Sequence, residues 1–378
     1  MRRTSPPAAV VLAAAFALLL AACSSKSSGS SSSSGSSTDW QTATSAAAGG
    51  GMSALIAAAK QEGELNVIAL PPTWANYGTI IKDFSEKYGI KVNSANPNGS
   101  SQDEVDAVRQ QSGTGAQPDV LDVGQSVALE NTDLFSPYEV ATWSDIPDSQ
   151  KDPSGLWYED YGGFMAIGYD SAKFGTITSS SQLLDPKFKN AVALDGNPTE
   201  ANAALNGVMM VNLENGGSLA NISKGVDFFH QLNQAGNFVP VQATSATVKA
   251  GTTPVVIDWD YLNATHGSDD PNWKVVVPSD ATLGGYYTQA ITKGAPHPAA
   301  ARLWEEFLYS QDAQGGQNLW LAGGARPVEM DAMTANGSID QSLAAKLPPV
   351  TGSPEFMSDT QSTDASTYLA ANWTKAIS

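Results

Sequence analysis

Short apolar segments typical of buried strands alternate with helical segments along most of this chain. An early strand predicted over residues 64–70 is followed by a helix with Ile80, Ile81 and Phe84 on one face, and then by a strand over residues 90–92. A strand–helix–strand unit of this kind holds two parallel strands together, with the helix packed across them. The pattern therefore predicts an α/β fold with a mostly parallel sheet and crossover helices.

The same alternation continues towards the C-terminus. Further strands are predicted at residues 120–123, 164–169, 191–194, 254–257, 273–277 and 289–291. Helices are predicted at residues 54–60 and 200–213, from Pro298, and after a capping box formed by Ser101 and Glu104. This folded part, of roughly 325 residues, exceeds one ordinary core and predicts two lobes.

The N-terminus has the organisation of an export signal. Arg2 and Arg3 precede an apolar run over residues 8–22, which is shorter than the roughly 18 to 20 residues that cross a bilayer. The run ends at Cys23, the single cysteine of the 378 residues, and Leu20-Ala21-Ala22-Cys23 looks like the lipobox of bacterial lipoproteins. We therefore predict a signal peptide over residues 1–22 and lipid attachment at Cys23, which would leave the protein outside the cytoplasm, anchored to the cell membrane.

A serine-rich tract follows the cysteine and continues to Ser37. Serine and glycine give a flexible coil that buries no core. Residues 23–51 are therefore predicted to be a Ser/Gly-rich tether between the anchor and the folded lobes.

Charge and cysteine content exclude some classes of partner and some sources of stability. The chain carries 20 lysines and arginines against 38 acidic residues, a net charge of −18. This excess opposes binding to a phosphate backbone, so no nucleic-acid partner is expected. A single cysteine also excludes a disulfide within the chain, and stability must come from packing.

Four stretches stand out by their order and spacing over nearly the whole chain after the signal peptide. They lie at residues 60–67 with 84–92, at residues 117–124, at residues 168–170 with 183–190, and at residues 293–298 leading to 307–310 and Gln314. Lys293-Gly294-Ala295-Pro296-His297-Pro298 is the most diagnostic of them. Together they resemble the type 2 periplasmic-binding-protein family, in particular its spermidine/putrescine, ferric iron and phosphonate receptors.

This resemblance implies a two-lobed periplasmic-binding-protein type 2 fold with discontinuous lobes and two crossing segments. Lobe 1 is expected to comprise residues 52–165 and 287–323, and lobe 2 residues 166–286 and 324–378. The resemblance also implies the substrate-binding component of an ABC importer, which captures a small-molecule ligand between the lobes and delivers it to an ABC permease in the membrane. We expect a monomer that closes on its ligand and that uses no cofactor and no metal.

Candidate ligand contacts in the first half of the chain are partly aromatic. Trp74 and Tyr77 follow the first predicted strand, at the sheet edge where α/β proteins bind ligands. Polyamine receptors carry a tryptophan and a tyrosine with this spacing, so the resemblance implies that both contact the ligand. An aromatic face attracts an ammonium group by about 0.5 to 2 kcal/mol. Ser100 and Glu200, each at a predicted helix start, are further candidates, although helix capping and dipole stabilisation explain such residues equally well.

Candidate contacts in the second half combine acids with aromatic rings. Asp258, Trp259 and Asp260 place two carboxylates around an indole directly after a buried strand. Tyr286 and Tyr287 lie on the second expected crossing segment, where polyamine receptors commonly have an acid in place of Tyr287. No lysine or arginine lies in these candidate segments, and the residues therefore favour an organic cation, such as a polyamine.

Two other ligand classes remain open from the sequence. The adjacent tyrosines suggest a ferric receptor, although ferric receptors have their tyrosine pair one strand earlier, near residues 259–261. A phosphonate or sulfate receptor would use serines and helix N-termini, which the segments at Ser100-Ser101 and Thr244-Ser245 offer.

An extracytoplasmic hydrolase is the third alternative, because 38 acidic residues allow many carboxylate pairs. However, His230, His266 and His297 are far apart in the sequence, and no GxSxG, HExxH or GxxxxGK[ST] motif occurs. The sequence therefore predicts a protein without a catalytic site.

Overall fold

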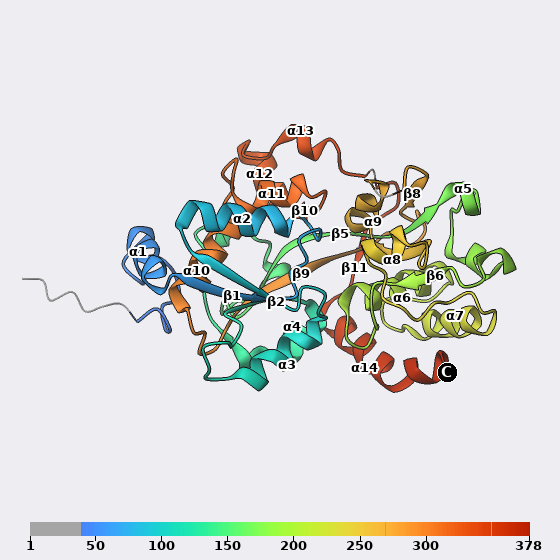
Figure 1. Ribbon diagram of the computed structural model, residues 1–378, viewed down its shortest axis with the longest axis horizontal. Helices are drawn as coiled ribbons and strands as arrows, with labels where there is room; N and C mark the ends of the chain where they lie inside the picture. Colours follow the sequence, from blue (N-terminus) through green and yellow to red (C-terminus); the bar gives the residue numbers. More distant parts are fainter. Residues whose placement is uncertain (1–38, 269, 349) are drawn as a thin grey trace, which may run out of the picture. The chain divides into compact units, whose positions relative to one another are not determined.

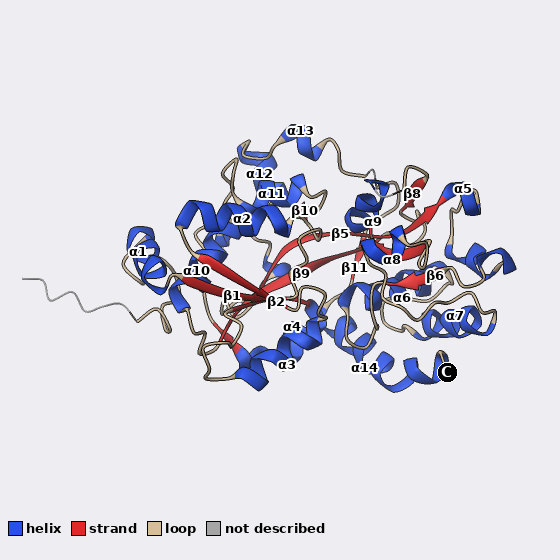
Figure 2. Ribbon diagram, in the orientation of Figure 1, coloured by secondary structure: helices blue, strands red, loops and turns tan. Residues whose placement is uncertain are grey.

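The computed structural model describes residues 39–268, 270–348 and 350–378, which form an α/β protein (Figure 1, Figure 2). Cys23 and the predicted signal peptide lie outside the described residues. The strands are β1 Glu64–Ile68, β2 Lys91–Ala95, β3 Val120–Gly124, β4 Phe135–Ser136, β5 Tyr158–Asp170, β6 Val192–Leu194, β7 Val255–Trp259, β8 Trp273–Val276, β9 Leu283–Thr292, β10 Arg326–Pro327 and β11 Glu355–Phe356. The helices are α1 Met52–Glu62, α2 Tyr77–Tyr88, α3 Ser101–Gln111, α4 Gln125–Glu130, α5 Ser171–Phe174, α6 Asn202–Glu214, α7 Ser223–Gln234, α8 Ser245–Lys249, α9 Asp260–Thr265, α10 Pro298–Leu308, α11 Gly316–Ala322, α12 Met330–Asn336, α13 Gln341–Ala344 and α14 Asp359–Ala376.

Two long strands, β5 and β9, connect two lobes (Figure 1). The first part of β5, up to Phe164, pairs with β9, and its second part, from Met165, pairs with β7 and β8. The strand β9 also pairs with β3 and β4. Helices α1, α2, α3 and α10 gather at one end of these two strands, and α5 to α8 gather at the other. The predicted α/β fold with discontinuous lobes and two crossing segments is confirmed.

The expectation of a mostly parallel sheet is wrong. Among the described residues, six strand pairings are antiparallel. Three are parallel, namely β1 with β2, β6 with β7 and β9 with β11. Every antiparallel pairing involves β5 or β9. Each lobe completes its sheet with a strand that crosses from the other lobe, and the hydrophobic pattern of a segment does not reveal the direction in which it runs.

Helix α10 shows how the cores are assembled. Pro298 occupies its first turn, where the missing backbone amide costs nothing. The apolar face predicted from residue 298 onwards is buried, and the Trp304 ring meets Phe84 of α2 edge-on at 5.1 Å between centroids. No helix in the described ranges combines the length and the apolar character needed to span a bilayer.

Residues 39–51, the end of the predicted tether, pack onto lobe 1. Trp40 and Ala43 are buried in the main core. The guanidinium of Arg302 in α10 donates hydrogen bonds to the backbone oxygens of Ala43 and Gln41, at 2.8 and 3.2 Å. The tether prediction is therefore corrected for this stretch, because its few apolar residues find partners that composition alone does not reveal.

The chain after β10 also stays with lobe 1. Leu321 of α11, Met333 of α12 and Ile339 form an apolar cluster of their own, and α13 contacts α11. The sequence assigned this stretch to lobe 2. The packing instead keeps α12 and α13 with lobe 1, whereas α14 beyond them packs against both α4 of lobe 1 and α7 of lobe 2.

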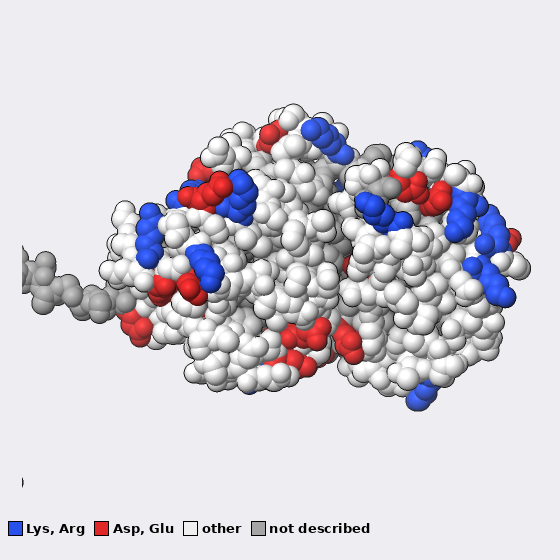
Figure 3. Space-filling view, viewed as in Figure 1, with Lys and Arg blue, Asp and Glu red and all other residues white. Residues whose placement is uncertain are grey.

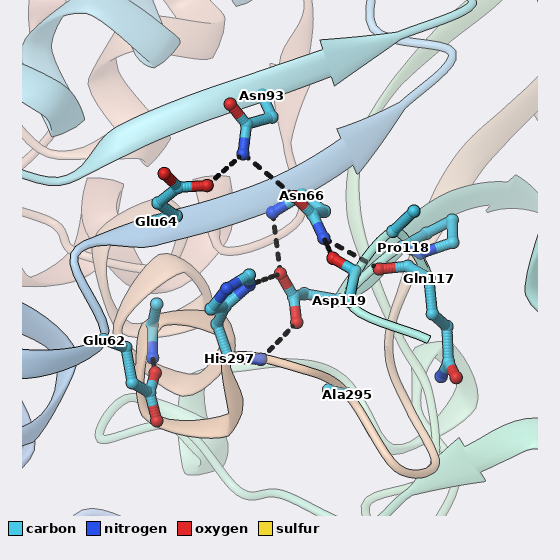
Figure 4. Close-up of polar contacts among 12 residues, drawn as sticks. Glu62, Glu64, Asn66, Asn93, Gln117, Pro118, Asp119, Ala295 and His297 are labelled. Carbon is cyan, nitrogen blue, oxygen red and sulfur yellow. Dashed lines mark hydrogen bonds and ion pairs between the residues drawn. The ribbon is translucent and has the colours of Figure 1, made fainter. Parts of the chain in front are cut away.

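A buried carboxylate joins three segments of lobe 1 (Figure 4). Oδ2 of Asp119 accepts a hydrogen bond from the backbone amide of Asn66 in β1 at 2.6 Å and lies 2.8 Å from Nδ1 of His297. Oδ1 of Asp119 accepts from the backbone amide of His297 at 2.7 Å. The carboxylate of Glu62 then accepts from two backbone amides in the first turn of α10. These contacts fix the start of α10 against the end of α1 and the sheet formed by β1 and β2.

The stability of this junction should depend on the protonation of His297. The hydrogen bond to Asp119 raises the pKa of His297 above its usual value of 6.5. Because the pKa is raised in the folded state, the imidazolium stabilises the fold fully below pH 6.5, and this contribution is lost as the pH rises through the folded-state pKa. We expect His297→Gln to lower the free energy of unfolding by about 1 kcal/mol more at pH 5.5 than at pH 9. Urea unfolding at both pH values measures this, and an equal loss at the two would contradict it.

Candidate functional site

A cavity of about 510 Å³ lies between the two lobes. It is lined by Asp122 of β3, Asp258 of β7 and residues that follow β1 and β6, among them Trp74 and Asp195. The carboxyl ends of strands are the usual ligand-binding edge of α/β sheets, and the volume suits a small molecule. Figure 3 shows a groove between the lobes, with acidic side chains on both of its sides.

The lining of this cavity is acidic. It contains no lysine or arginine among the described residues, whereas six carboxylates line it: Asp103, Glu104, Asp122, Asp195, Glu200 and Asp258. Four of the six, Glu104, Asp122, Asp195 and Asp258, are buried. Burying a carboxylate away from water is unfavourable unless a cation or several donors compensate its charge.

On the lobe 1 side, Asp122 is the member of a buried hydrogen-bond network that accepts from two tyrosine hydroxyls. Its Oδ2 accepts hydrogen bonds from the hydroxyls of Tyr77 and Tyr161, at 2.7 and 2.9 Å. The Tyr161 hydroxyl accepts in turn from Nε1 of Trp74 at 2.6 Å. Burial raises the pKa of Asp122 to about 7, although the two hydroxyl hydrogen bonds oppose this rise.

Helix α3 contributes a second buried acid because its cap lies one residue earlier than predicted. Ser100 and Asp103 form the capping box, instead of Ser101 and Glu104. The Glu104 carboxylate is thereby free to accept a hydrogen bond from the backbone amide of Asp122, at 3.0 Å. Burial, and then the charge of Asp122, raise the pKa of Glu104 well above its usual range.

On the lobe 2 side, Asp195 and Asp258 form a pair of buried carboxyls. Oδ1 of Asp258 accepts from the backbone amide of Trp259 at 2.7 Å, and Oδ1 of Asp195 accepts from Nε2 of Gln242 at 3.1 Å. Burial raises the pKa of Asp195 to about 7. Burial, and then the charge of Asp195, raise the pKa of Asp258 well above its usual range.

Aromatic rings lie between the two sets of acids. Trp74 meets the ring of Tyr287 edge-on, at 5.6 Å between centroids. Tyr161 stacks on Tyr287 at 5.6 Å, and Trp259 meets Tyr287 edge-on at 6.3 Å. Because Trp74 and Tyr287 line the cavity, a ligand there would touch aromatic surface as well as carboxylates.

The structure brings five of the nine predicted contact residues to this cavity, namely Trp74, Ser100, Glu200, Asp258 and Tyr287. Ser100 also caps α3, as the alternative interpretation of that residue held. The other four predicted residues do not line it: Tyr77, Trp259, Asp260 and Tyr286.

Each of these four has another partner. Tyr77 donates its hydroxyl to Asp122, and the Trp259 ring lies in the core. Asp260 forms an ion pair with Arg326 of β10 at 2.8 Å and also accepts from the backbone amide of Phe164. Tyr286 stacks on Phe356 of β11 at 6.3 Å. We therefore revise the set of candidate ligand contacts.

The sequence analysis did not identify four acids of the site, namely Asp103, Glu104, Asp122 and Asp195. Asp122 lies within the strand predicted over residues 120–123, and Asp195 directly follows the strand predicted over residues 191–194. Asp103 and Glu104 lie in the predicted capping box. The sequence feature that could have identified Asp122 and Asp195 is an aspartate inside or directly after a run of apolar residues. A carboxylate at such a position is buried and needs a specific partner.

The two lobes also touch each other at the cavity. The backbone amide of Gln102 in α3 lies 3.4 Å from the backbone oxygen of Glu200. A Cβ atom at Gly124, the last residue of β3, would lie 2.3 Å from Cβ of Asn202 at the start of α6. Glycine at this position is therefore required for the lobes to come this close.

Residues 120–348 match the family model described as bacterial extracellular solute-binding protein. The match spans more than half of the chain. The chain belongs to this family. The matched segment of this solute-binding protein begins with β3, which carries Asp122, and also contains Asp195 and Asp258, so three of the buried acids lie within it.

Solved structures with the same fold include several binding proteins. The periplasmic binding protein AfuA from Actinobacillus pleuropneumoniae, with fructose-6-phosphate bound, is 18% identical with a TM-score of 0.65, over 83% of this chain and 98% of that one. Iron-bound HitA from Pseudomonas aeruginosa is 18% identical with a TM-score of 0.61, over 82% and 98%. A putative spermidine/putrescine ABC transporter protein from Listeria monocytogenes is 14% identical with a TM-score of 0.62, over 83% and 98%. At these identities the likeness establishes the fold of the solute-binding protein and not its ligand.

Proposed function

We propose that this solute-binding protein binds an organic cation with amino groups and delivers it to the permease of an ABC importer, as a monomer and without catalysing a reaction. The observation that carries the proposal is the cavity lining, which among the described residues has six acidic side chains and no lysine or arginine. An ammonium group forms charge-assisted hydrogen bonds with carboxylates and so compensates their burial. A polyamine is the simplest ligand with this chemistry.

The aromatic part of the lining supports the same ligand class. Trp74 and Tyr287 line the cavity between the acids of the two lobes. A cation over such a face gains about 0.5 to 2 kcal/mol, and methylene groups between two amines bury apolar surface against the rings. The cavity therefore matches a ligand with charged ends and an apolar middle.

The ligands bound by two relatives of the same fold fit this lining less well. A sugar phosphate, as in AfuA, calls for arginine, lysine or several free amides around the phosphate. The starts of α3 and α8 do line the cavity, but six carboxylates line it as well and would repel an anion. Iron, as in HitA, was considered because of the tyrosine pair. Of that pair only Tyr287 lines the cavity, and the described residues contain no group of three or more His, Cys, Asp or Glu placed to hold a metal ion.

Calorimetric titration of the purified protein tests the proposal. Putrescine, spermidine and choline represent diamines, polyamines and quaternary amines, while fructose-6-phosphate, methylphosphonate and ferric citrate are the controls. We expect at least one amine to bind with a Kd of about 10 μM or lower, an affinity of roughly −7 kcal/mol. Binding of a control without a response to any amine would contradict the cation proposal and leave the family membership intact.

Closure of the lobes on the ligand should depend on Gly124. In Gly124→Ala the new methyl group would meet Asn202 and oppose the approach of the lobes, at a cost of about 1 to 3 kcal/mol. We expect an affinity for spermidine about tenfold lower and a smaller decrease in the radius of gyration on saturation, measured by small-angle scattering. Gly115→Ala is the control, because a Cβ atom at Gly115 has nothing within 4 Å. Equal contraction of the two variants would contradict this prediction.

A lipid anchor at Cys23 is part of the proposal, because the single cysteine ends the N-terminal apolar run. Cys23→Ala should remove the attachment point and move the protein from the membrane fraction to the medium, or leave it unprocessed. Cell fractionation with gel mobility measures this, and Ser25→Ala serves as the matched control. Unchanged membrane association and mobility of Cys23→Ala would contradict the anchor.

A further inference from the structure

One carboxylate oxygen of Asp122 accepts two hydrogen bonds, and the other has no hydrogen-bond partner among the described residues. Oδ2 accepts the hydroxyl hydrogen bonds of Tyr77 and Tyr161. Oδ1 is buried and has no hydrogen-bond partner among the described residues. The residue is only 7% exposed and lines the cavity. A buried oxygen of this kind costs about 1 to 3 kcal/mol unless a donor reaches it, and more when the group is charged.

The direction of the hydrogen bonds fixes how this carboxylate is held. The Tyr77 hydroxyl accepts from Nε2 of Gln289 at 3.1 Å, and the Tyr161 hydroxyl accepts from Nε1 of Trp74 at 2.6 Å. An amide and an indole nitrogen can only donate in these contacts, so each hydroxyl has its single proton left for Asp122. Oδ2 therefore cannot turn away without breaking both bonds, and the carboxylate presents Oδ1 as its remaining acceptor.

The charged and titratable groups around Asp122 do not include a cation that could satisfy it. Glu104 and Asp160 are buried acids whose own pKa values are raised, by burial first and then by the charge of Asp122. A hydrogen-bond donor for Oδ1 of Asp122 would therefore have to come from a ligand in the cavity.

We propose that Asp122 determines the specificity of lobe 1 for a positively charged ligand group, with Oδ1 accepting a hydrogen bond from a ligand ammonium and with Tyr77 and Tyr161 as positioning residues. This inference rests on the proposed function and adds the residue that recognises the charge on the lobe 1 side. Asp195 and Asp258 face the cavity from lobe 2, and Asp122 gives the ligand a second anionic contact across from them.

Asp122→Asn tests the proposal directly, with spermidine as the probe in calorimetric titration. Loss of a charge-assisted hydrogen bond should weaken binding about ten- to a hundredfold. Glu159→Gln is the matched control, because it also removes one buried carboxyl but one that lies outside the cavity lining. We expect this control to bind within about threefold of the wild type, because the Glu159 carboxyl accepts a hydrogen bond from Gln150 and does not line the cavity.

The positioning role is tested by a double-mutant cycle. Tyr77→Phe removes one of the two hydrogen bonds to Oδ2 at a residue that does not line the cavity, and should weaken spermidine binding about three- to tenfold. In the Asp122→Asn background the same change should have almost no further effect on affinity. Additive losses would show that Tyr77 acts only through the fold, and would overturn its positioning role.

The outcomes separate this inference from the proposed function. If the wild type binds spermidine or another amine and Asp122→Asn binds it equally well, the assignment of Asp122 is overturned while the cation receptor stands. If no amine binds to the wild type, both are overturned. If Asp122→Asn does not fold, as its thermal unfolding would show, Tyr77→Phe decides alone, and unchanged affinity in that variant would overturn the inference.

Discussion

Asp258→Asn should weaken the binding of spermidine about ten- to a hundredfold, because it removes a charged acceptor from the lobe 2 side of the cavity. Asp258 is only 3% exposed, lines the cavity and has Oδ1 fixed by the backbone amide of Trp259. Asparagine preserves this backbone contact and the side-chain volume, so the fold should tolerate the change. Calorimetric titration of the variant against spermidine measures the loss.

Asp260→Asn provides the contrasting control two residues away. Asp260 is in an ion pair with Arg326 and does not line the cavity. Removing one partner of this buried pair should lower the free energy of unfolding by about 3 kcal/mol and leave spermidine affinity within a few-fold of the wild type. A large loss of affinity in Asp260→Asn, or none in Asp258→Asn, would contradict the assignment of these two acids.

Spermidine affinity should rise steeply with pH. Burial raises the pKa values of Asp122 and Asp195 to about 7, so below that pH both are increasingly protonated and cannot pair with a cation. Amines with pKa values near 10 stay charged throughout this range. We expect affinity to increase about tenfold or more between pH 6 and pH 8. Titrations of spermidine and of choline, whose charge does not depend on pH, measure this.

The stability of the ligand-free protein should decrease as the pH rises, whereas its spermidine affinity increases. The raised folded-state pKa values of Asp122 and Asp195 mean that their ionisation destabilises the fold as the pH rises from the usual aspartate pKa of 3.8 towards about 7. The increase in melting temperature caused by spermidine should therefore be larger at pH 8 than at pH 6. A flat pH profile in both experiments would show that these carboxyls do not face the bound cation.

Much of the fold could be predicted from the sequence because strand and helix periodicities are local properties. The segments around Val120, Val192, Val255 and Pro298 lie in the predicted elements. Strand direction and the packing of residues 39–51 could not be predicted, since both depend on partners far along the chain. Arg302, for example, donates a hydrogen bond to the backbone oxygen of Ala43, although the two residues are 259 positions apart in the chain.

The candidate site was less accessible to sequence reasoning for the same reason. Asp258 and Asp260 stand two residues apart and look equivalent in the sequence, but β7 ends at Trp259 and α9 begins at Asp260. The turn between these elements directs Asp258 to the cavity and Asp260 to Arg326. The role of Asp122 could not be predicted from the sequence, because its partners Tyr77 and Tyr161 lie in a helix and a strand that are far apart in the chain.

The crossing strands also determine the order in which the chain can complete its fold during synthesis. The lobe 2 sheet joins Met165 to Trp259 and so closes within one continuous stretch. In lobe 1, β3 cannot pair until β9 has been synthesised, because Val120 of β3 pairs with Ile291 of β9. Contacts between segments this distant are slow to form, as the loop between them must first be closed. The strand edge of β3 therefore stays unpaired until residue 291 has been made, whereas β1 and β2 can pair with each other long before then.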